Sequence, residues 1–383
     1  MVRYIRHIII CTCAIGILSL TGCSGDSVDG KEQMRTRELH LSLGTHQFDA
    51  TRASDNLPVG FEDYEQSAAL AKILRIQGYM TYYENTDHTW EAVSCTFTPD
   101  ASTWTSMVSL KPSETYYLYG FMPKENLFVS NGYVDIAPYE TSYEKGAVLT
   151  FNGLNTVVAG DFCTFVGVSG YGISPPSVPD MKSRLGKFDY EPDTEGNSIY
   201  LLVDHIYAGL KFSMTLDATY AQLRDIKVKR VNLIPIPEED NNVIVSVDAV
   251  VTIVANNNNQ NPMSVVFQNP VSGNKPKEAT LYDGENGDGL SLSTDHPSFM
   301  ACVMPKNNPG DKVNTKYTLE TTYDVFDRKG NLIREDEKAQ NAITLEYSNL
   351  DIGKLHTVNI TVMPTYLYVL SDPDLDNPTF TVE

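Results

Sequence analysis

The chain has 383 residues, and its 29 Lys and Arg against 49 Asp and Glu give a formal net charge of -20. Such an excess of negative charge repels phosphate backbones, which argues against nucleic acid as a partner. Tyrosine occurs 22 times and phenylalanine 14 times, and both residue types favour β-strands and sandwich cores. A chain of this length is expected to fold into about two domains.

The N-terminus has the pattern of an export signal. Two arginines precede an apolar stretch from Ile8 to Leu20, which is shorter than the roughly 20 residues that cross a bilayer as a helix. The stretch ends in Leu-Thr-Gly-Cys, which is typical of the cleavage site of a bacterial lipoprotein. We therefore predict a signal peptide over residues 1–22 and lipidation, as with palmitate, at Cys23. An ordinary signal peptide followed by a fortuitous cysteine is the alternative.

The first half of the chain shows strand patterns after a polar start. Residues 23–37 lack periodicity, which predicts a flexible tether. From Glu38 on, Leu39, Leu41 and Leu43 alternate with polar residues, the period of a half-buried strand. A helix is expected over 64–74. Further strands are expected within 73–83, 115–123, 146–151 and 160–170.

A proline-rich stretch without periodicity, residues 171–198, separates the two halves. We predict one β-sandwich domain over 38–185 and a second over 186–383, with extra strands at the C-terminus. The second half opens with one long strand expected over 199–216, followed by hairpins within 243–267 and 318–335. Terminal strands are expected at 356–364, 365–370 and 379–383. The predicted fold class is all-β.

No residue pattern points to catalysis. The histidines are scattered without metal-ligand spacing, and Tyr171 occupies the second glycine position of a serine-elbow motif. His205 is expected to pack at a sheet surface with its ring hydrogen-bonded. We therefore predict that the chain is not an enzyme and needs no cofactor.

Metal and disulfide chemistry are also not expected. Asp372, Asp374 and Asp376 have the odd spacing of a calcium loop, but the required glycine is replaced by Asn377. We interpret this segment, and the similar 283–289, as solvated turns, and calcium binding stays open. Once the signal peptide and Cys23 are set aside, an odd number of cysteines remains. These are Cys95, Cys163 and Cys302, which we predict to be small buried apolar residues.

Four stretches taken together resemble one family. They are LHLSLGTHQFDATRAS (39–54), YYLYGFMP (116–123), LLVDHIYAGLKFSM (201–214) and KLHTVNITVMPTYLYVLSDPDLDNPTFTV (354–382). On these stretches the chain resembles the fimbrillins of the type V pili of Bacteroidetes, the FimA/Mfa-like superfamily, without a single diagnostic motif. The resemblance implies tandem β-sandwich domains of the transthyretin-like type and export as a lipoprotein to the cell outer membrane.

The resemblance also implies how such a subunit polymerises. An arginine-specific protease cuts in the loop behind the first strand, here after Arg52, so that Ala53 becomes the N-terminus. The strand that carries Leu39, Leu41 and Leu43 then leaves, and a terminal strand of a neighbouring subunit replaces it by β-augmentation. The partners implied are the protease, the outer membrane through the lipid before cleavage, and other pilin subunits in a homo- or hetero-polymer. The candidate donor positions are Tyr366, Tyr368, Leu370, Phe380 and Val382.

Several alternatives stay open at this point. Cutting after Arg35 or Arg37 would free only the tether, which is why Arg52 is preferred. The sequence does not separate a stalk from a tip subunit of an extracellular fimbrium. A pilus anchor that keeps its lipid is one rival. The other is a monomeric surface lipoprotein that binds glycan or a host ligand through aromatic residues such as Trp90 and Trp104, which fit a sandwich core equally well.

Overall fold

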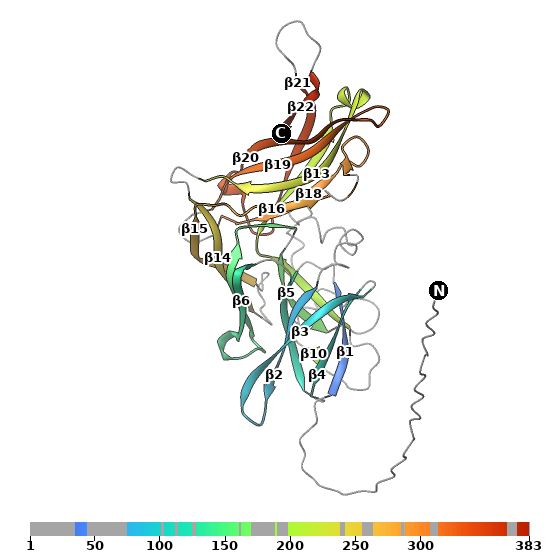
Figure 1. The fold of residues 1–383 in the computed structure, drawn as a ribbon. Helices are drawn as coiled ribbons and strands as arrows, with labels where there is room; N and C mark the ends of the chain where they lie inside the picture. The colour runs from blue at the N-terminus through green and yellow to red at the C-terminus, as the bar shows by residue number, and fades with distance from the viewer. Residues whose placement is uncertain are drawn as a thin grey trace, which may run out of the picture. The chain divides into compact units, whose positions relative to one another are not determined.

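The fold is all-β, as the sequence predicts. The computed structural model describes residues 35–43, 75–100, 103–111, 114–124, 128–160, 162–169, 188–189, 198–237, 242–254, 263–284, 287, 289–306, 313–365 and 374–382. These residues form strands and short 3₁₀ turns (Tyr139–Thr141, Tyr220–Gln222 and Tyr347–Asn349), with no α-helix among them (Figure 1). The helix expected over 64–74 lies outside the described residues.

The largest sheet closes on itself. Its order is β10 (Phe188–Asp189), β5 (Thr115–Met122), β2 (Ile76–Glu84), β3 (Thr89–Asp100), β4 (Thr103–Leu110), β1 (Arg35–Leu43), β11 (Ser198–His205) and β9 (Cys163–Ser169). Strand β9 also pairs with β5, so the strands from β5 through β1 to β9 form a ring. Each strand of the ring pairs with a strand on both sides, so the ring is a small β-barrel.

The barrel interior is filled by side chains from alternate positions of its strands, as a closed sheet requires. Three glycines in the barrel strands, Gly78, Gly120 and Gly167, leave space for these side chains. A Cβ on Gly120 would overlap the backbone of Gln77 and the ring of Phe165, and one on Gly78 would meet the ring of Phe97. The buried cluster is Ile76, Met80, Tyr82, Cys95, Phe97, Trp104, Val108, Leu110, Tyr116, Leu118, Met122, Cys163, Phe165, Ile199 and Leu201.

Three further sheets share a second core. One has the order β22 (Asp374–Val382), β21 (Leu355–Thr365), β12 (Ala208–Leu216), β18 (Ser298–Val303) and β8 (Val157–Ala159). Another has β16 (Ala279–Asp283), β13 (Arg224–Pro235), β19 (Lys316–Asp327) and β20 (Leu332–Thr344), with β17 (Leu290–Ser291) paired to β13. The last has β15 (Met263–Gly273), β14 (Val243–Val254), β7 (Gly146–Asn155) and β6 (Phe128–Pro138).

Strand β5 belongs to both cores. Tyr116 and Leu118 point into the barrel, whereas Tyr119 and Phe121 join the second core. The rings of Phe121 and Phe151 lie 5.3 Å apart, and the Tyr119 hydroxyl donates to the carbonyl oxygen of Tyr143 at 2.7 Å. Burial of both faces explains why this strand is apolar and aromatic without alternation.

One strand prediction is wrong. The single strand expected over 199–216 is two strands, β11 and β12, which belong to different sheets. The chain changes sheet at Ile206 and Tyr207, both fully buried, so no polar residue marks the break. Within β12 the expected face is confirmed, since Ala208, Leu210, Phe212 and Met214 are buried.

Both predicted hairpins are confirmed. Strands β14 and β15 pair antiparallel, as do β19 and β20. The second hairpin turns at Asp327, whose carboxylate accepts hydrogen bonds from the backbone N–H groups of Lys329 and Asn331, each at 2.8 Å. Gly330 completes the turn with a φ of 83°, which glycine adopts without a steric penalty.

Strand pairings run across the expected boundary at residues 185 and 186. Strand β7 pairs with β14, β8 pairs with β18, and β1 pairs with β11. By contacts, Met34–Glu383 form one compact unit. The division into two domains stays a prediction, and segments from both halves of the sequence share sheets.

Candidate functional site

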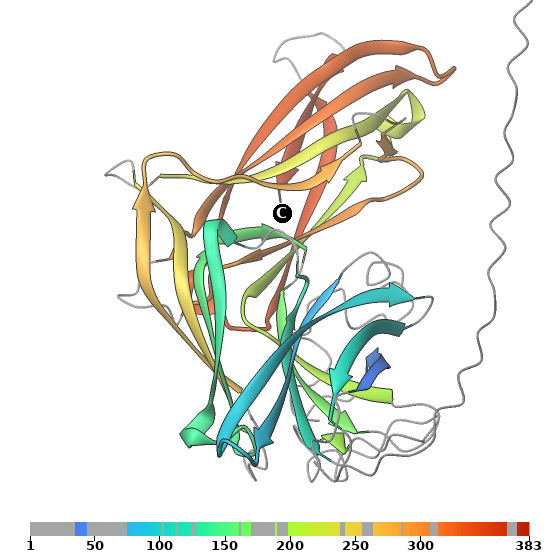
Figure 2. The same ribbon diagram turned by 60° about the horizontal axis from the view of Figure 1, so that its bottom comes forward.

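Strand β1 completes the barrel. Among the described residues it is the first strand, and it lies between β4 and β11 (Figure 2, where β1 is blue). It begins at Arg35, earlier than the expected Glu38. Arg37 and Arg35 therefore lie in the strand itself, opposite Val108 and Leu110 of β4.

The two neighbours of β1 run in different directions relative to it. It pairs antiparallel with β4, where Leu41 lies opposite Trp104 and Leu39 opposite Ser106. It pairs parallel with β11, where Leu41 is also the partner of Ile199. The pairing thus gives β1 a defined direction and register, and the register decides which of its positions share a face with the barrel interior.

The walls beside β1 are apolar. Trp104, Val108, Ile199 and Leu201 are between 0% and 5% exposed. Directly opposite residues of paired strands lie on one face of a sheet, so positions 39, 41 and 43 of β1 fall in line with these buried neighbours. The sequence predicts the alternation in β1. It does not predict β11 as the neighbour of β1, because the two strands, Arg35–Leu43 and Ser198–His205, are far apart in the sequence.

The C-terminal strand β22 begins at Asp374, earlier than the expected residue 379. Asp374 and Asp376 therefore lie in a strand and not in the predicted turn, because the pairing with β21 extends to Thr365.

Strand β22 pairs antiparallel with β21, where Phe380 lies opposite Val362 and Val382 opposite Ile360. Phe380 is 5% exposed, and its ring lies 4.9 Å from that of Tyr323 in the facing sheet. Its carbonyl oxygen accepts a hydrogen bond from Nδ2 of Asn341 at 2.6 Å. Two candidate donor positions, Phe380 and Val382, thus lie in the core sheet of the subunit.

Other predicted site residues lie outside the described residues. They are the lipidation residue Cys23, the cleavage residues Arg52 and Ala53, and the donor positions Tyr366, Tyr368 and Leu370. The structure therefore brings together the strand that is expected to leave and the walls that hold it, and it leaves the cleavage position and the segment 366–370 as predictions.

The cysteines and His205 are buried, as structural residues are. Cys95, Cys163 and Cys302 are buried in the core and form no disulfide in the described part of the chain. Burial raises the pKa of the Cys95 thiol to about 12, which keeps it protonated and unreactive. His205 is 5% exposed, with Nδ1 3.0 Å from Sγ of Cys163. Its ring is hydrogen-bonded as expected, but it lies in the interior and not at a sheet surface.

Both tryptophans belong to cores. Trp104 lies in the barrel interior, and the half-buried Trp90 packs edge to face with Tyr83, Tyr117 and Tyr143. Among the described residues, no group of three or more His, Cys, Asp or Glu side chains is arranged to hold a metal ion. No helix in that part of the chain is long and apolar enough to cross a membrane.

Comparisons with known proteins give similarity at the level of solved structures. No protein-family model and no curated protein sequence matches the chain. A fimbrial protein from Bacteroides vulgatus is 9% identical, with 91% of this chain and 98% of that chain covered at a TM-score of 0.34. The fimbrial anchor protein Mfa2 from Porphyromonas gingivalis is 9% identical, with 91% and 97% covered at a TM-score of 0.30. Superpositions with scores this low leave the function of the chain to be argued from its own residues.

Proposed function

We propose that the protein is a structural pilin subunit, stalk or tip, of a type V fimbria. It is exported as a lipoprotein to the cell outer membrane, cleaved after Arg52, and polymerised by strand exchange into an extracellular fimbrium that supports adhesion. The observation that carries the proposal is the position of β1, which by itself joins β4 to β11 in the barrel. Removal of any strand would open the ring, but β1 precedes all the other described strands in the chain, so one cut after it would release it without removing another of them.

Removal of β1 creates a site for another strand. The backbone groups of β4 and β11 that now pair with residues 35–43 would lose their partners, and an unpaired strand edge favours pairing with another chain. The buried Trp104 and Ile199 would be exposed at the same time. Each large apolar side chain returned to such a site contributes about 1.5–3 kcal/mol, so refilling the gap is strongly favoured.

The strand that refills the gap must meet the requirements of β1. In the place of β1 it would run antiparallel to β4 and parallel to β11 as β1 does, and it needs apolar residues at alternate positions. Tyr366, Tyr368 and Leu370 have this spacing, as do Phe380 and Val382. Head-to-tail exchange builds a filament when the rotation from one subunit to the next does not close into a ring.

The first test is cleavage at Arg52. Protein recovered from the surface of its own cells should begin at Ala53 and form SDS-resistant ladders. The Arg52→Ala and Arg52→Lys variants should remain folded monomers that begin at lipidated Cys23, because an arginine-specific protease accepts neither residue. Arg37→Ala is the matched control and should polymerise normally. Ladders formed by Arg52→Ala as readily as by the wild type would refute the cleavage step.

A second test separates the two candidate donor segments. Serine at all five positions from 366 to 370 removes the apolar side chains of both faces of one segment and leaves Phe380 packed against Tyr323. If residues 365–370 are the donor, this variant should be cleaved, keep the stability of the wild type, and fail to extend. Normal extension by this variant would assign the donor role to the strand that carries Phe380 and Val382.

A further inference from the structure

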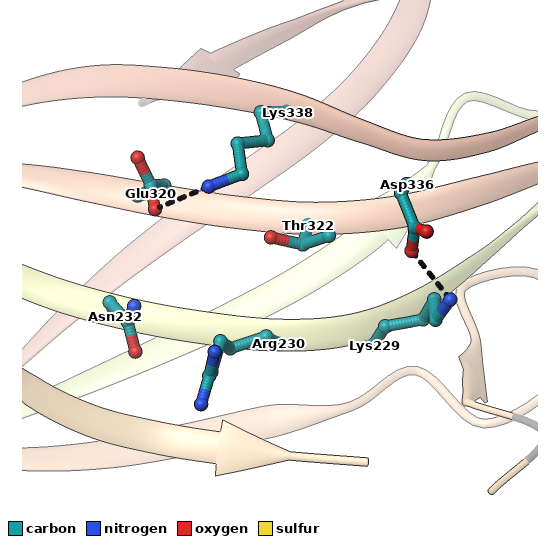
Figure 3. A pocket seen from close by; sticks show the side chains of 7 residues that line it. All are labelled: Lys229, Arg230, Asn232, Glu320, Thr322, Asp336 and Lys338. Atoms are coloured by element: carbon teal, nitrogen blue, oxygen red, sulfur yellow. Dashed lines mark hydrogen bonds and ion pairs between the residues drawn. The ribbon is translucent and has the colours of Figure 1, made fainter. Parts of the chain in front are cut away.

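The outer face of the β13–β19–β20 sheet carries two polar rows. In one row Asn232 lies opposite Glu320, which lies opposite Gln340. In the next, Arg230 lies opposite Thr322, which lies opposite Lys338. Opposed residues share a face, and the positions between the rows, such as Val231, belong to the core on the other face. Figure 3 shows five members of the two rows, Asn232, Glu320, Arg230, Thr322 and Lys338.

The rows surround a hollow of about 360 Å³. Each charged side chain that lines it already has an ion-pair partner. Lys229 pairs with Asp336 at 2.6 Å, and Lys338 with Glu320 at 3.5 Å. Arg230 pairs with Asp283 at 3.0 Å, outside the lining. These pairs balance the charges of the lining within the protein, so the hollow does not select a charged ligand.

Two residues of the lining, Arg230 and Asn232, each carry a buried side-chain atom, Nε and Oδ1, without a hydrogen-bond partner among the described residues, and Asn232 supplies the acceptor. Asn232 is 5% exposed. A buried acceptor left without a donor destabilises the fold, so a ligand that donates to it would be favoured. Thr322, 8% exposed, presents a hydroxyl to the same hollow.

We propose that this hollow binds a short, neutral saccharide. None of the described residues that line it is aromatic or aliphatic, so an apolar ligand finds no complementary surface. Hydroxyl groups both donate and accept hydrogen bonds, which suits the Asn232 acceptor, the Thr322 hydroxyl and the remaining N–H groups of Lys338. The volume falls at the lower end of small-molecule sites, which span about 300–1,000 Å³. The inference is independent of polymerisation, since the barrel strand β1 takes no part in the hollow.

The test uses the full chain and saturation-transfer NMR. The probes are galactose, mannose, N-acetylglucosamine and the acidic N-acetylneuraminic acid. At least one neutral sugar should bind at millimolar concentration, and Asn232→Leu should weaken that binding by at least about tenfold while melting no lower than the wild type. Thr322→Val, which keeps the side-chain shape, should also weaken it and serves if Asn232→Leu does not fold.

The matched control is Thr321→Val. Thr321 also has a buried oxygen without a partner in the described part of the chain, but it does not line the hollow. This variant should bind sugar as the wild type does. The proposal is overturned if no neutral sugar binds, if Asn232→Leu and Thr322→Val bind as well as Thr321→Val, or if only N-acetylneuraminic acid binds.

Discussion

Phe380→Ala tests whether the terminal strand belongs to the core of its own subunit. The Phe380 side chain lies between β21 and the facing sheet, 5% exposed, with the Tyr323 ring at 4.9 Å. Burial of that partner is substantial as well, since it raises the pKa of Tyr323 to about 12. Loss of the phenyl group would leave a cavity between two sheets that are held by many other strands and cannot collapse around it.

The expected loss of unfolding free energy follows from this geometry. Phe→Ala substitutions in cores cost about 3–5 kcal/mol, and a position near the chain end in an edge strand should fall at the lower limit, about 3 kcal/mol. The contact between the Phe380 and Tyr323 rings accounts for part of this loss of unfolding free energy. A double-mutant cycle with Phe380→Leu and Tyr323→Leu should give a coupling of about 1 kcal/mol, as aromatic pairs do.

Urea unfolding of the uncleaved monomer measures both quantities. Val382→Ala is the matched control, because Val382 is on the same strand but only partly buried, and it should lose about 1 kcal/mol. A loss below about 0.5 kcal/mol for Phe380→Ala would refute the reasoning. It would mean that β22 is not held against Tyr323 in solution and is free to act elsewhere.

Two further predictions concern the barrel and the pH dependence. Gly120→Ala should lower the free energy of unfolding by about 1–3 kcal/mol, because the new methyl group would lie 2.5 Å from the Phe165 ring. The control is Gly287→Ala, where the nearest atom to the new methyl group is 3.6 Å away; it should change urea unfolding little. Burial lowers the pKa of His356 from 6.5, so the unfolded chain binds the proton more tightly, and stability should fall as the pH drops below about 6.5. Urea midpoints at several pH values should show a smaller drop for His356→Gln, and an equal drop would contradict the assignment.

Local pattern was sufficient for many elements of this fold. The alternation at Leu39, Leu41 and Leu43 predicts β1, and the Asp327–Gly330 turn predicts the β19–β20 hairpin, because both depend on neighbouring residues alone. The break at Ile206 and Tyr207 could not be seen, since a chain that is buried as it changes sheet shows no polar residue there. The parallel pairing of β1 with β11 joins distant segments of the chain, and so does the pairing that sets Asn232 opposite Glu320. The alternation of residues within one segment does not determine which distant strand it pairs with or in which register.

The two candidate donor segments differ in how strongly their sequences specify register in the place of β1. A slip by one residue turns every side chain of a strand to the other face. In 379–383 the alternation is strict, since Phe380 and Val382 are flanked by Thr379, Thr381 and Glu383, so a slipped strand would bring polar groups into the barrel. In 365–370 both faces carry apolar residues, with Leu367 and Val369 opposite the tyrosines. A one-residue slip of that segment would still place apolar side chains beside Trp104 and Ile199, so its pattern specifies the register less strongly than that of 379–383.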